Sequence, residues 1–541
     1  MGSVNSSTLG RGDAGNVTIN ARDTVAFDGV GSDGRNSAAL SRVLPEAVGK
    51  GGEIRITTGS LFVTNGAQLE VSTAGKGNAG VVTINARDTV TFDGESSNGF
   101  ISTARSRVES TAVGKGGDIN ITTGSLSVTN GAFLTASTLG RGDAGNVFVQ
   151  AKDFVSLADA TIFSSVENGR GGNGGDINVT TGSLFLTNGA QLVATSRGPN
   201  INITGVSPIN FVQLLARVFG GNAGNIQINA TDAVSISGAN SITGDSSGLF
   251  TNTNSIGKGG NITVNTSALR VSDGAVLDAR TNNFGNGGNI TVNARLIETI
   301  NGGQLIATSS NSGRAGKITV NASDRVIVNG SDATFSERVA KFGERVANPE
   351  AASGFFVRSL SSGAAGDIEV TTPQIRLDNG ARFNAESASG NGGNINLRVG
   401  DLLLLRGGSF ISATAGTAQQ GGDGGNITIN APSGFIVSAP NENSDITANA
   451  FNGSGGRINI NSLGIFNFTQ RTREDLVREL RTDNPNQLNP QQLQTNDITA
   501  FSLTNPTLSG QIIINTPDVD PSKGFVELPT VSRPKTSAIA L

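Results

Sequence analysis

The 541-residue chain contains no cysteine, histidine, tryptophan or tyrosine, and Met1 is its only methionine. Without cysteine it can have no disulfide, no thiolate zinc site and no cysteine nucleophile. Without histidine it lacks the commonest general base and metal ligand, so a Ser-His-Asp triad is impossible. The absence of cysteine also fits a chain that crosses an oxidising compartment unfolded.

Charge and long apolar runs are scarce as well. Charged residues make up 15% of the chain, and 39 basic against 43 acidic residues leave a net charge of −4. The composition therefore shows no excess of positive charge of the kind that binds nucleic acid. No apolar run approaches the roughly 18 residues that a membrane-spanning helix needs. We expect neither a nucleic-acid partner nor a membrane span.

Glycine, in contrast, is abundant: the chain has 75, about twice the ordinary share of roughly 7%. Much of it belongs to a recurring phrase of a small residue, glycine, a polar residue and then alternating apolar residues. The phrase occurs fifteen times, from AGNVTIN (14–20) to SGQIIIN (509–515). Its anchor glycines lie at positions 15, 52, 80, 117, 145, 175, 224, 260, 288, 316, 366, 393, 425, 456 and 510. The shortest spacing is 27–28 residues, and repeats of this length are the signature of a solenoid.

Each full repeat carries three short segments in which apolar and polar residues alternate. In one copy they are 119–121, 126–128 and 132–136, and Asn130-Gly131 precedes the third. This alternation predicts half-buried strands, and Asn-Gly tolerates the positive φ of a sharp corner. We predict an all-β fold, a right-handed single-stranded parallel β-helix of about 15 coils with three short strands each and short helical insertions. Coils stack at roughly 4.8 Å, so a bulky corner residue would clash with the next coil.

Two versions of the repeat alternate strictly near the N-terminus. One version carries ARDTV (21–25 and 86–90), and the other carries TTGSL (57–61 and 122–126). Their combined period is 65 residues. The array is therefore interpreted as the product of duplicating a two-coil unit.

The repeat array is expected to fill residues 1–468 and to begin in the middle of a coil, because SSTLGRGDAG (6–15) nearly repeats ASTLGRGDAG (136–145). Residues 469–500 are predicted to form a helical insertion or cap, with Leu476, Val477 and Leu480 on one helical face. Residues 501–530 would hold the terminal coil and a closing segment, and 531–541 a flexible tail.

Two further insertions break the repeat. Residues 197–222 include the apolar INFVQLLARVF (209–219), and residues 331–364 include SERVAKFGERV (336–346), which alternates charge at helical spacing. Insertions in solenoids map to exposed loops and often form the binding face. The same segments can also serve only to cover the core. The sequence leaves both interpretations open for these two insertions and favours a cap for 469–500.

Three motifs carry a resemblance to a known family. They are the phrase G-[ND]-A-G-N-[IV]-x-[IV]-N-A, the segment [TS]-x-G-x-L-x-[VL]-x-N-G-A and the closing INTPDVDPSKGFVELP (514–529). Together, over roughly residues 5–530, they resemble large exoproteins of the filamentous-haemagglutinin type, above all the cyanobacterial group. The resemblance implies export by two-partner secretion through a dedicated outer-membrane transporter. The chain would then be secreted or displayed on the outer surface of a Gram-negative, cyanobacterial-type cell. The signal peptide and N-terminal secretion domain of that family have no counterpart here, as expected for a truncated chain.

Two motifs could carry binding chemistry. Arg-Gly-Asp (11–13 and 141–143) invites an integrin-binding interpretation, but both copies fill the slot of KGN (76–78), so we interpret them as ordinary corners. GGNGGDINV (171–179) resembles a nonapeptide calcium repeat, yet Asn178 stands where that motif needs an apolar residue. We therefore predict no metal site and no cofactor.

The aspartates of the ARD-type corner form a regular row, and polysaccharide-cleaving β-helices use surface carboxylates. The row consists of Asp23, Asp88, Asp153, Asp232 and Asp324. Its first three members would lie about 9.6 Å apart, at the outer limit of roughly 9.5 Å for an inverting glycosidase pair. Enzyme sites break repeats and these residues follow theirs, so side chains that cap local turns explain the row better. We predict no catalytic residue and leave the binding residues unassigned.

The expected function is that of an adhesin-like structural rod and not an enzyme. It would present loops and stacked Thr, Asn and Ser side chains to an unknown surface, glycan or matrix ligand. Two alternatives stay open: a polysaccharide-acting β-helix lyase or glycosidase, and a passive stalk for a distant functional head. A non-repeating cluster of Asp, Arg or Lys on one face would favour the enzyme, and the sequence shows none.

Overall fold

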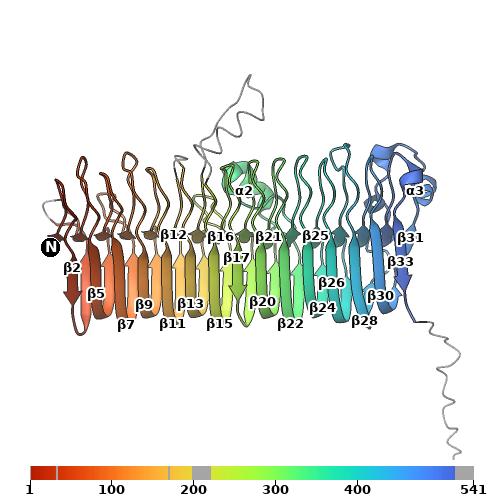
Figure 1. Ribbon diagram of the computed structural model, residues 1–541. Helices are drawn as coiled ribbons and strands as arrows, with labels where there is room; N and C mark the ends of the chain where they lie inside the picture. Colours follow the sequence, from red (N-terminus) through yellow and green to blue (C-terminus); the bar gives the residue numbers. More distant parts are fainter. Residues whose placement is uncertain (1, 32–33, 168–170, 198–220, 518–541) are drawn as a thin grey trace, which may run out of the picture.

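The computed structural model describes residues 2–31, 34–167, 171–197 and 221–517. They form one parallel β-helix, in which the coils follow one another from the N-terminal to the C-terminal end (Figure 1). Every strand pairs in parallel with its equivalent one coil away, as β7 (Val81–Asp93) does with β5 (Glu53–Thr64). The predicted all-β solenoid is confirmed.

A long sheet runs along one side of the rod. Among the described residues it has fifteen rungs, as many as the copies of the glycine phrase, because β2 and β3 share a rung and so do β17 and β18. Its strands are β2 (Val17–Asn20), β3 (Thr24–Asp28), β5, β7, β9 (Ile119–Thr129), β11 (Val147–Ala158), β13 (Ile177–Thr187), β15 (Ile226–Ser237), β17 (Ile262–Asn265), β18 (Ala268–Ser272), β20 (Ile290–Ile300), β22 (Ile318–Asn329), β24 (Ile368–Asp378), β26 (Ile395–Leu405), β28 (Ile427–Ser438), β30 (Arg457–Phe466) and β33 (Gln511–Asn515).

A second sheet consists of strands of three residues each. In spatial order they are β1 (Ser3–Asn5), β4 (Ala38–Leu40), β6 (Gln68–Glu70), β8 (Thr103–Arg105), β10 (Phe133–Thr135), β12 (Thr161–Phe163), β14 (Gln191–Val193), β16 (Gly248–Phe250), β19 (Val276–Asp278), β21 (Gln304–Ile306), β23 (Gly354–Phe356), β25 (Arg382–Asn384), β27 (Phe410–Ser412), β29 (Asp445–Thr447), β32 (Asp497–Thr499) and β31 (Thr469–Arg471). The last two are out of chain order. The chain therefore lays down the terminal strand β31 first and then returns to insert β32 beneath it.

The three predicted segments of each coil are present, with one refinement. Segments 119–121 and 126–128 run together as the single strand β9, and segment 132–136 contains β10. Between them Asn130 and Gly131 have φ values of 53° and 83°, the corner geometry that Asn-Gly predicts. A further ladder of single bridges, such as that between Thr73 and Val108, completes each coil.

The alternation of ARD and TGS coils has a steric reason. Where β5 meets β7, one residue (Gly59) faces two (Arg87 and Asp88), which shifts the register. A Cβ atom on Gly59 would lie 2.3 Å from the carbonyl oxygen of Asp23 in the preceding coil. The glycine of one coil type therefore makes room for the bulged main chain of the other.

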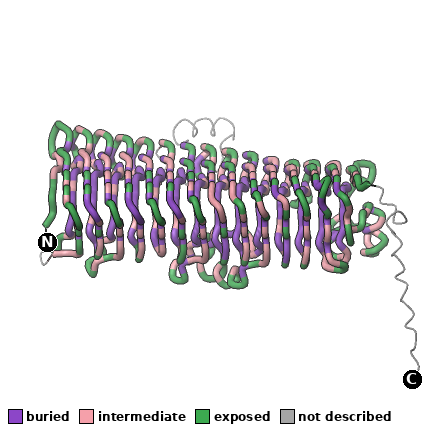
Figure 2. Tube along the Cα trace, turned by 90° about the horizontal axis from the view of Figure 1, so that it is seen from below, coloured by how far each residue is buried: buried purple, intermediate pink, exposed green. Residues whose placement is uncertain are grey.

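The interior is a stack of apolar side chains, and buried residues recur along the coils in Figure 2. Ile54, Val82 and Ile119 follow one another in register and are fully buried. Phe355 and Phe383 stack with ring centroids 4.7 Å apart. Burying each such side chain contributes roughly 1.5–3 kcal/mol, so the stability of the core is spread over all the coils.

The anchor glycines stack directly on one another. A Cβ atom on Gly288 would lie 1.8 Å from the carbonyl oxygen of Gly260, and the same close approach recurs along the array. A second glycine ladder runs beside it, in which a Cβ atom on Gly285 would lie 1.8 Å from the oxygen of Gly257. These contacts confirm that the corners exclude side chains because the next coil is too close.

The insertion at 331–364 folds over the outer face of the short sheet. It contains α2 (Phe335–Phe342) and the 3-10 helix η1 (Gly343–Arg345). Arg338 pairs with Asp332 at 2.6 Å, and Ala347 packs on the buried apolar cluster Val193, Phe250, Val276, Ile306 and Phe356. This insertion covers apolar surface outside the main core.

The insertion at 469–500 includes β31, α3 (Arg473–Leu480) and the 3-10 helices η2 (Pro485–Gln487) and η3 (Pro490–Gln492). Leu476, Leu488 and Phe501 form a small core of their own, with Val477 and Leu480 packed against it. The predicted apolar face of α3 is confirmed. No helix of the described residues is long and apolar enough to cross a membrane. The apolar stretch 209–219, most of the closing segment 514–529 and the tail 531–541 lie outside the described residues.

Candidate binding groove

Two rows of side chains flank the stacked glycine corner that leads into the long sheet. The first row lies two residues before each of the first fourteen anchor glycines, and the second row lies one residue after each of them. The first row is Asp13, Lys50, Asn78, Lys115, Asp143, Asn173, Asn222, Lys258, Asn286, Arg314, Ala364, Asn391, Asp423 and Ser454. The second row is Asn16, Glu53, Val81, Asp118, Asn146, Asp176, Asn225, Asn261, Asn289, Lys317, Asp367, Asn394, Asn426 and Arg457.

The Asn and Asp side chains of both rows tie each coil to the next. Asn261 Oδ1 accepts the main-chain N–H of Asn289, and Asn289 Oδ1 accepts that of Lys317, both at 2.9 Å. In the first row Asn286 Oδ1 accepts the N–H of Arg314 at 3.0 Å. Each such bond satisfies a main-chain donor that no strand pairing reaches and contributes roughly 0.5–1.5 kcal/mol.

This bonding fixes what the asparagines offer to the outside. The amide oxygen is used inside the stack, and the amide nitrogen is left for a ligand only where it does not also bond the preceding coil, as that of Asn225 does with Asp176 at 3.0 Å. The Nδ2 atoms of Asn261, Asn286 and Asn289 have no hydrogen-bond partner in the described part of the chain. Successive coils therefore present hydrogen-bond donors at the coil spacing of about 4.8 Å.

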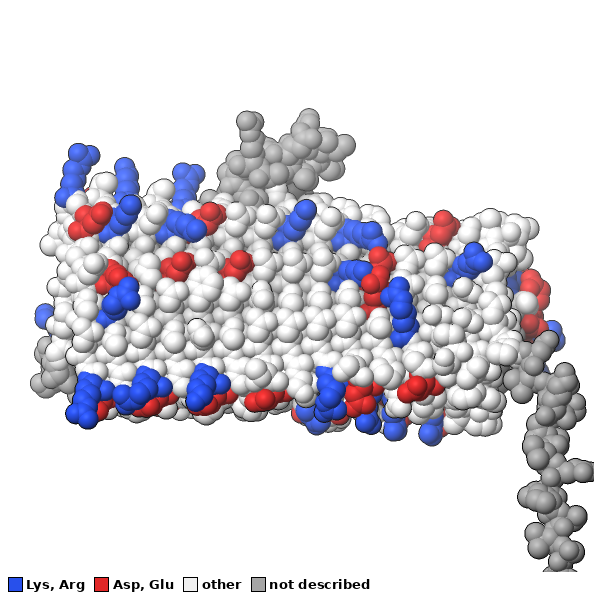
Figure 3. Space-filling model, turned by 60° about the horizontal axis from the view of Figure 1, so that its bottom comes forward, with Lys and Arg blue, Asp and Glu red and all other residues white. Residues whose placement is uncertain are grey.

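One stretch of the two rows contains no acidic residue. We call it the donor track: Asn222, Lys258, Asn286 and Arg314 in the first row, and Asn225, Asn261, Asn289 and Lys317 in the second. Asp176 borders it on one side and Asp367 on the other. Elsewhere on this face basic and acidic side chains are interleaved, as Figure 3 shows. The donor track is thus the part of the corner best suited to groups that accept hydrogen bonds or carry negative charge.

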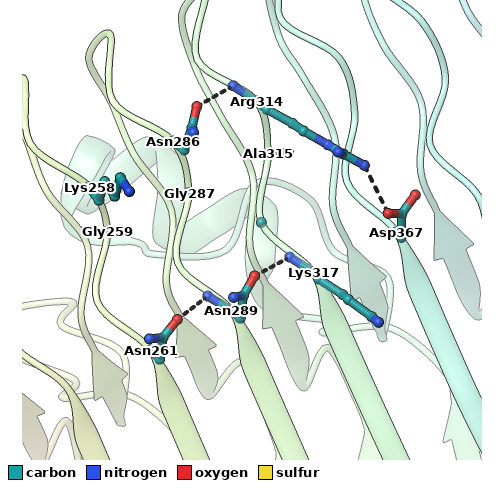
Figure 4. A pocket seen from close by; sticks show the side chains of 11 residues that line it. Lys258, Gly259, Asn261, Asn286, Gly287, Asn289, Arg314, Ala315, Lys317 and Asp367 are labelled. Carbon is teal, nitrogen blue, oxygen red and sulfur yellow. Dashed lines mark hydrogen bonds and ion pairs between the residues drawn. The ribbon is translucent and has the colours of Figure 1, made fainter.

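The donor track is hollowed at its centre into a groove of about 470 Å³ (Figure 4). Arg314 reaches across it and pairs with Asp367 at 2.8 Å, and Lys317 pairs with Glu369 at 2.8 Å. Lys258 makes no ion pair within the described ranges. The two cations are exposed and their carboxylate partners are half-buried; such pairs near the surface are worth only about 0–1 kcal/mol, so an anionic ligand can compete for these cations. The groove is open and suits a segment of polymer better than an enclosed small molecule.

No family model, curated protein or solved structure matches this chain. The likeness to filamentous-haemagglutinin-type exoproteins therefore rests on the three quoted motifs alone.

The two Arg-Gly-Asp copies lie in the ordinary corner. Their glycines, Gly12 and Gly142, have φ values of 138° and 132° and belong to the second glycine ladder. Their aspartates belong to the first row: Asp13 accepts the N–H of Lys50 at 2.7 Å, and Asp143 that of Asn173 at 2.8 Å. The expected position of both copies in the repeat corner is confirmed, and both carboxylates hold the next coil.

The aspartates of the ARD-type corner are placed differently from the expectation. Asp88 binds the neighbouring Arg87 through both carboxylate oxygens, at 3.1 and 2.8 Å, and does not cap a turn. At Asp23 it is the main-chain carbonyl that accepts the N–H of Ser60 across coils, at 2.7 Å. No group of three or more acidic residues placed to hold a metal ion occurs within the described ranges.

Sequence reasoning did not assign the residues of the donor track. The signal was present in the phrase itself, because the polar residue after each anchor glycine is mostly Asn or Asp. The alternation of apolar residues does not show which atom of the Asn or Asp side chain bonds the next coil. The free amide nitrogens follow only from the coil-to-coil hydrogen bonds.

Proposed function

We propose that this chain is the adhesin-like rod of a secreted or surface-displayed exoprotein of the filamentous-haemagglutinin type. It contacts surfaces, glycans or matrix through many weak, repeated interactions along its length. By resemblance, its export partner is an outer-membrane two-partner-secretion transporter, and its location is outside a Gram-negative, cyanobacterial-type cell. The observation that carries the proposal is the donor track, in which the free amide nitrogens of Asn261, Asn286 and Asn289 lie beside three cations and neither row contains a carboxylate.

The donor track supports adhesion to a polymer rather than to a compact ligand. Four coils span about 14 Å at a spacing of 4.8 Å, so several neighbouring groups of one polymer can bind at once. Each exposed contact is weak, but contacts on a shared chain add through the high local concentration of the remaining groups. Polymers rich in carboxylate or sulfate oxygens complement the amide nitrogens and the cations Lys258, Arg314 and Lys317.

A glycan and matrix-protein array probed with the intact chain tests the proposal. We expect binding to acidic polysaccharides that weakens with added salt, because charged contacts at a surface are screened. The double substitution Asn286→Asp and Asn289→Asp keeps the oxygen that accepts the next coil's N–H and replaces each outward donor by an acceptor. Asp143 and Asp176 already serve at equivalent positions, so the fold should tolerate the change while binding falls severalfold.

Asn78→Asp is the matched control, since Asn78 occupies the first row outside the donor track and accepts the N–H of Lys115, as Asn286 accepts that of Arg314. It should leave binding unchanged. Absence of any binding to the array would leave the passive stalk as the better account. Turnover of pectin-like or algal glycans by the purified chain would instead establish the enzyme alternative.

A further inference from the structure

A second cavity lies near the C-terminal end of the rod, beneath the insertion that carries α3. It has a volume of about 290 Å³, near the small end of the roughly 300–1,000 Å³ typical of ligand pockets. One wall comes from the coils of β25, β27 and β29, and the other from residues 485–491 of the insertion. We call it the insertion pocket.

The outer wall of the insertion pocket is a rigid, duplicated turn. The sequence NPNQL (484–488) is followed directly by NPQQL (489–493). In each copy the asparagine side chain accepts the N–H two residues later, at 3.1 Å, and proline begins the 3-10 helix. Leu488 is buried in the small core of the insertion, and Leu493 packs against it. The wall is therefore held in place before any ligand arrives, which lowers the entropic cost of binding.

The duplicated turn shows polar side chains to the cavity. Asn486, Asn489 and Gln491 line it, and the side chains of Asn486 and Gln491 have no hydrogen-bond partner among the described residues. A cover that only shields the core would turn apolar groups inward, as Leu488 does. All three residues are exposed, so solvent satisfies their amides in the free protein and a ligand in the cavity can take the place of that water.

The opposite wall supplies hydroxyl groups and one carboxylate. Thr414 and Thr447 line it, together with Glu386, the single ionisable residue of the lining. Glu386 already accepts Ser412 Oγ at 2.5 Å and Asn384 Nδ2 at 2.9 Å. Leu503 and Phe451 add apolar surface. No cation is present in the lining to neutralise an acidic ligand.

We propose that the insertion pocket binds one neutral, hydroxyl-rich ring, such as a hexose unit of a glycan. Hydroxyl groups both donate and accept, which matches the amides of one wall and the hydroxyls and carboxylate of the other. The apolar residues suit the C–H face of a sugar ring. The carboxylate of Glu386 repels acidic sugars. This site is separate from the donor track, which offers cations and donors to acidic polymers.

Saturation-transfer NMR on the full chain tests this inference with glucose, galactose, mannose and N-acetylglucosamine as neutral probes and glucuronate as the acidic one. We expect transfer to at least one neutral sugar and none to glucuronate. The double substitution Asn486→Ala and Gln491→Ala removes two contacts and keeps Asn484, Asn489 and both prolines. It should weaken binding at least about tenfold, the loss expected for two ordinary hydrogen bonds.

Gln492→Ala is the matched control, because Gln492 lies in the same exposed turn outside the pocket lining. It should bind the sugar like the unmodified chain, and circular dichroism should show all variants folded. Asn286→Asp in the donor track should also leave sugar binding unchanged, which separates this site from the proposed adhesive function. The inference is overturned if no neutral sugar shows transfer, if the double variant binds normally, or if glucuronate binds as well as the neutral sugars.

Discussion

Asp445 lies fully buried on the outer face of the short sheet, where the insertion covers it. Its Oδ1 accepts the N–H of Asp497 at 2.8 Å, and its Oδ2 has no partner among the described residues. Burial raises the pKa of Asp445 to about 7, helped by the nearby negative charge of Asp497. Asp497 in turn is held by Arg471 at 2.9 Å. Asp445 is therefore protonated in the folded protein under mildly acidic conditions.

We predict that Asp445→Asn removes a pH dependence of stability. Between pH 3.8, the ordinary pKa of an aspartate, and pH about 7 the folded chain holds a proton that the unfolded chain has lost. The free energy of unfolding therefore falls as pH rises through this window, by about 1.4 kcal/mol per pH unit. Asparagine stays neutral and still accepts the N–H of Asp497. Thermal unfolding should show the variant more stable at pH 8 and nearly equal at pH 4.

Asp401→Asn serves as the comparison, because Asp401 is exposed on the long sheet. Its replacement should change the difference between the unfolding midpoints at pH 4 and pH 8 less than Asp445→Asn does. If Asp445→Asn changes that difference no more than Asp401→Asn, the buried aspartate does not titrate as its surroundings indicate.

A second prediction at the scale of single residues concerns the close stacking of the anchor glycines. In Gly288→Ala the new Cβ would lie 1.8 Å from a main-chain oxygen that the stack holds fixed. We expect destabilisation of at least about 2 kcal/mol, typical of severe overpacking, seen as a lower unfolding midpoint or insoluble protein. Gly421→Ala should be neutral, because no atom lies within 4 Å of its Cβ position. Equal behaviour of the two variants would contradict the steric role of the ladder.

At the scale of elements, α3 begins at a reciprocal capping arrangement. Thr472 Oγ1 accepts the N–H of Asp475 at 3.2 Å, and the Asp475 carboxylate accepts the N–H of Thr472 at 3.0 Å. The hydrogen bonds from Thr472 and Arg478 lower the pKa of Asp475 to about 2. This cap and the small core around Leu476 hold the insertion on the flank of the last coils.

Leu476→Ala should therefore loosen the insertion and leave the rod intact. The side chain is fully buried in a cluster separate from the main core, and such truncations cost roughly 2–5 kcal/mol. Hydrogen exchange should speed up across residues 473–503 and stay slow in β20 and β22. Val339→Ala in α2 is a matched helix control, since Val339 is exposed. Uniformly faster exchange along the rod would contradict the separate core.

Some elements of the fold could be predicted from the sequence and others could not. Alternation and Asn-Gly corners predicted the strands, because both depend on residues within one repeat. The periodicity of Leu476, Val477 and Leu480 predicted the face of α3 for the same reason. The placement of β32 between β29 and β31, and with it the insertion pocket, could not be predicted from the sequence. It depends on contacts between residues more than twenty positions apart, which no local pattern encodes.

For the whole molecule, the array should tolerate loss of complete two-coil units. Deletion of residues 80–144 removes 65 residues and places an ARD coil on a TGS coil, as in the intact chain. We expect a folded rod shorter by about 9.6 Å, twice the coil spacing, measurable by small-angle scattering. Deletion of residues 80–116 removes one coil and stacks two TGS coils. Gly59 then no longer faces the two-residue bulge of an ARD coil. The unfolding midpoint of this variant should be lower, and equal midpoints would show that the alternation has no structural role.

The direction of the hydrogen bonds in the rod decides how it responds to mechanical load. Strands lie across the rod and pair with their neighbours along its axis, so a pull on the two ends loads the coils in series. Coils should then peel from an end one at a time. Each of the shortest coils holds 27–28 residues and would release about 90 Å of extended chain in place of about 4.8 Å of rod. The stacking that stiffens the rod at rest thus allows it to extend many-fold under tension as coils unfold.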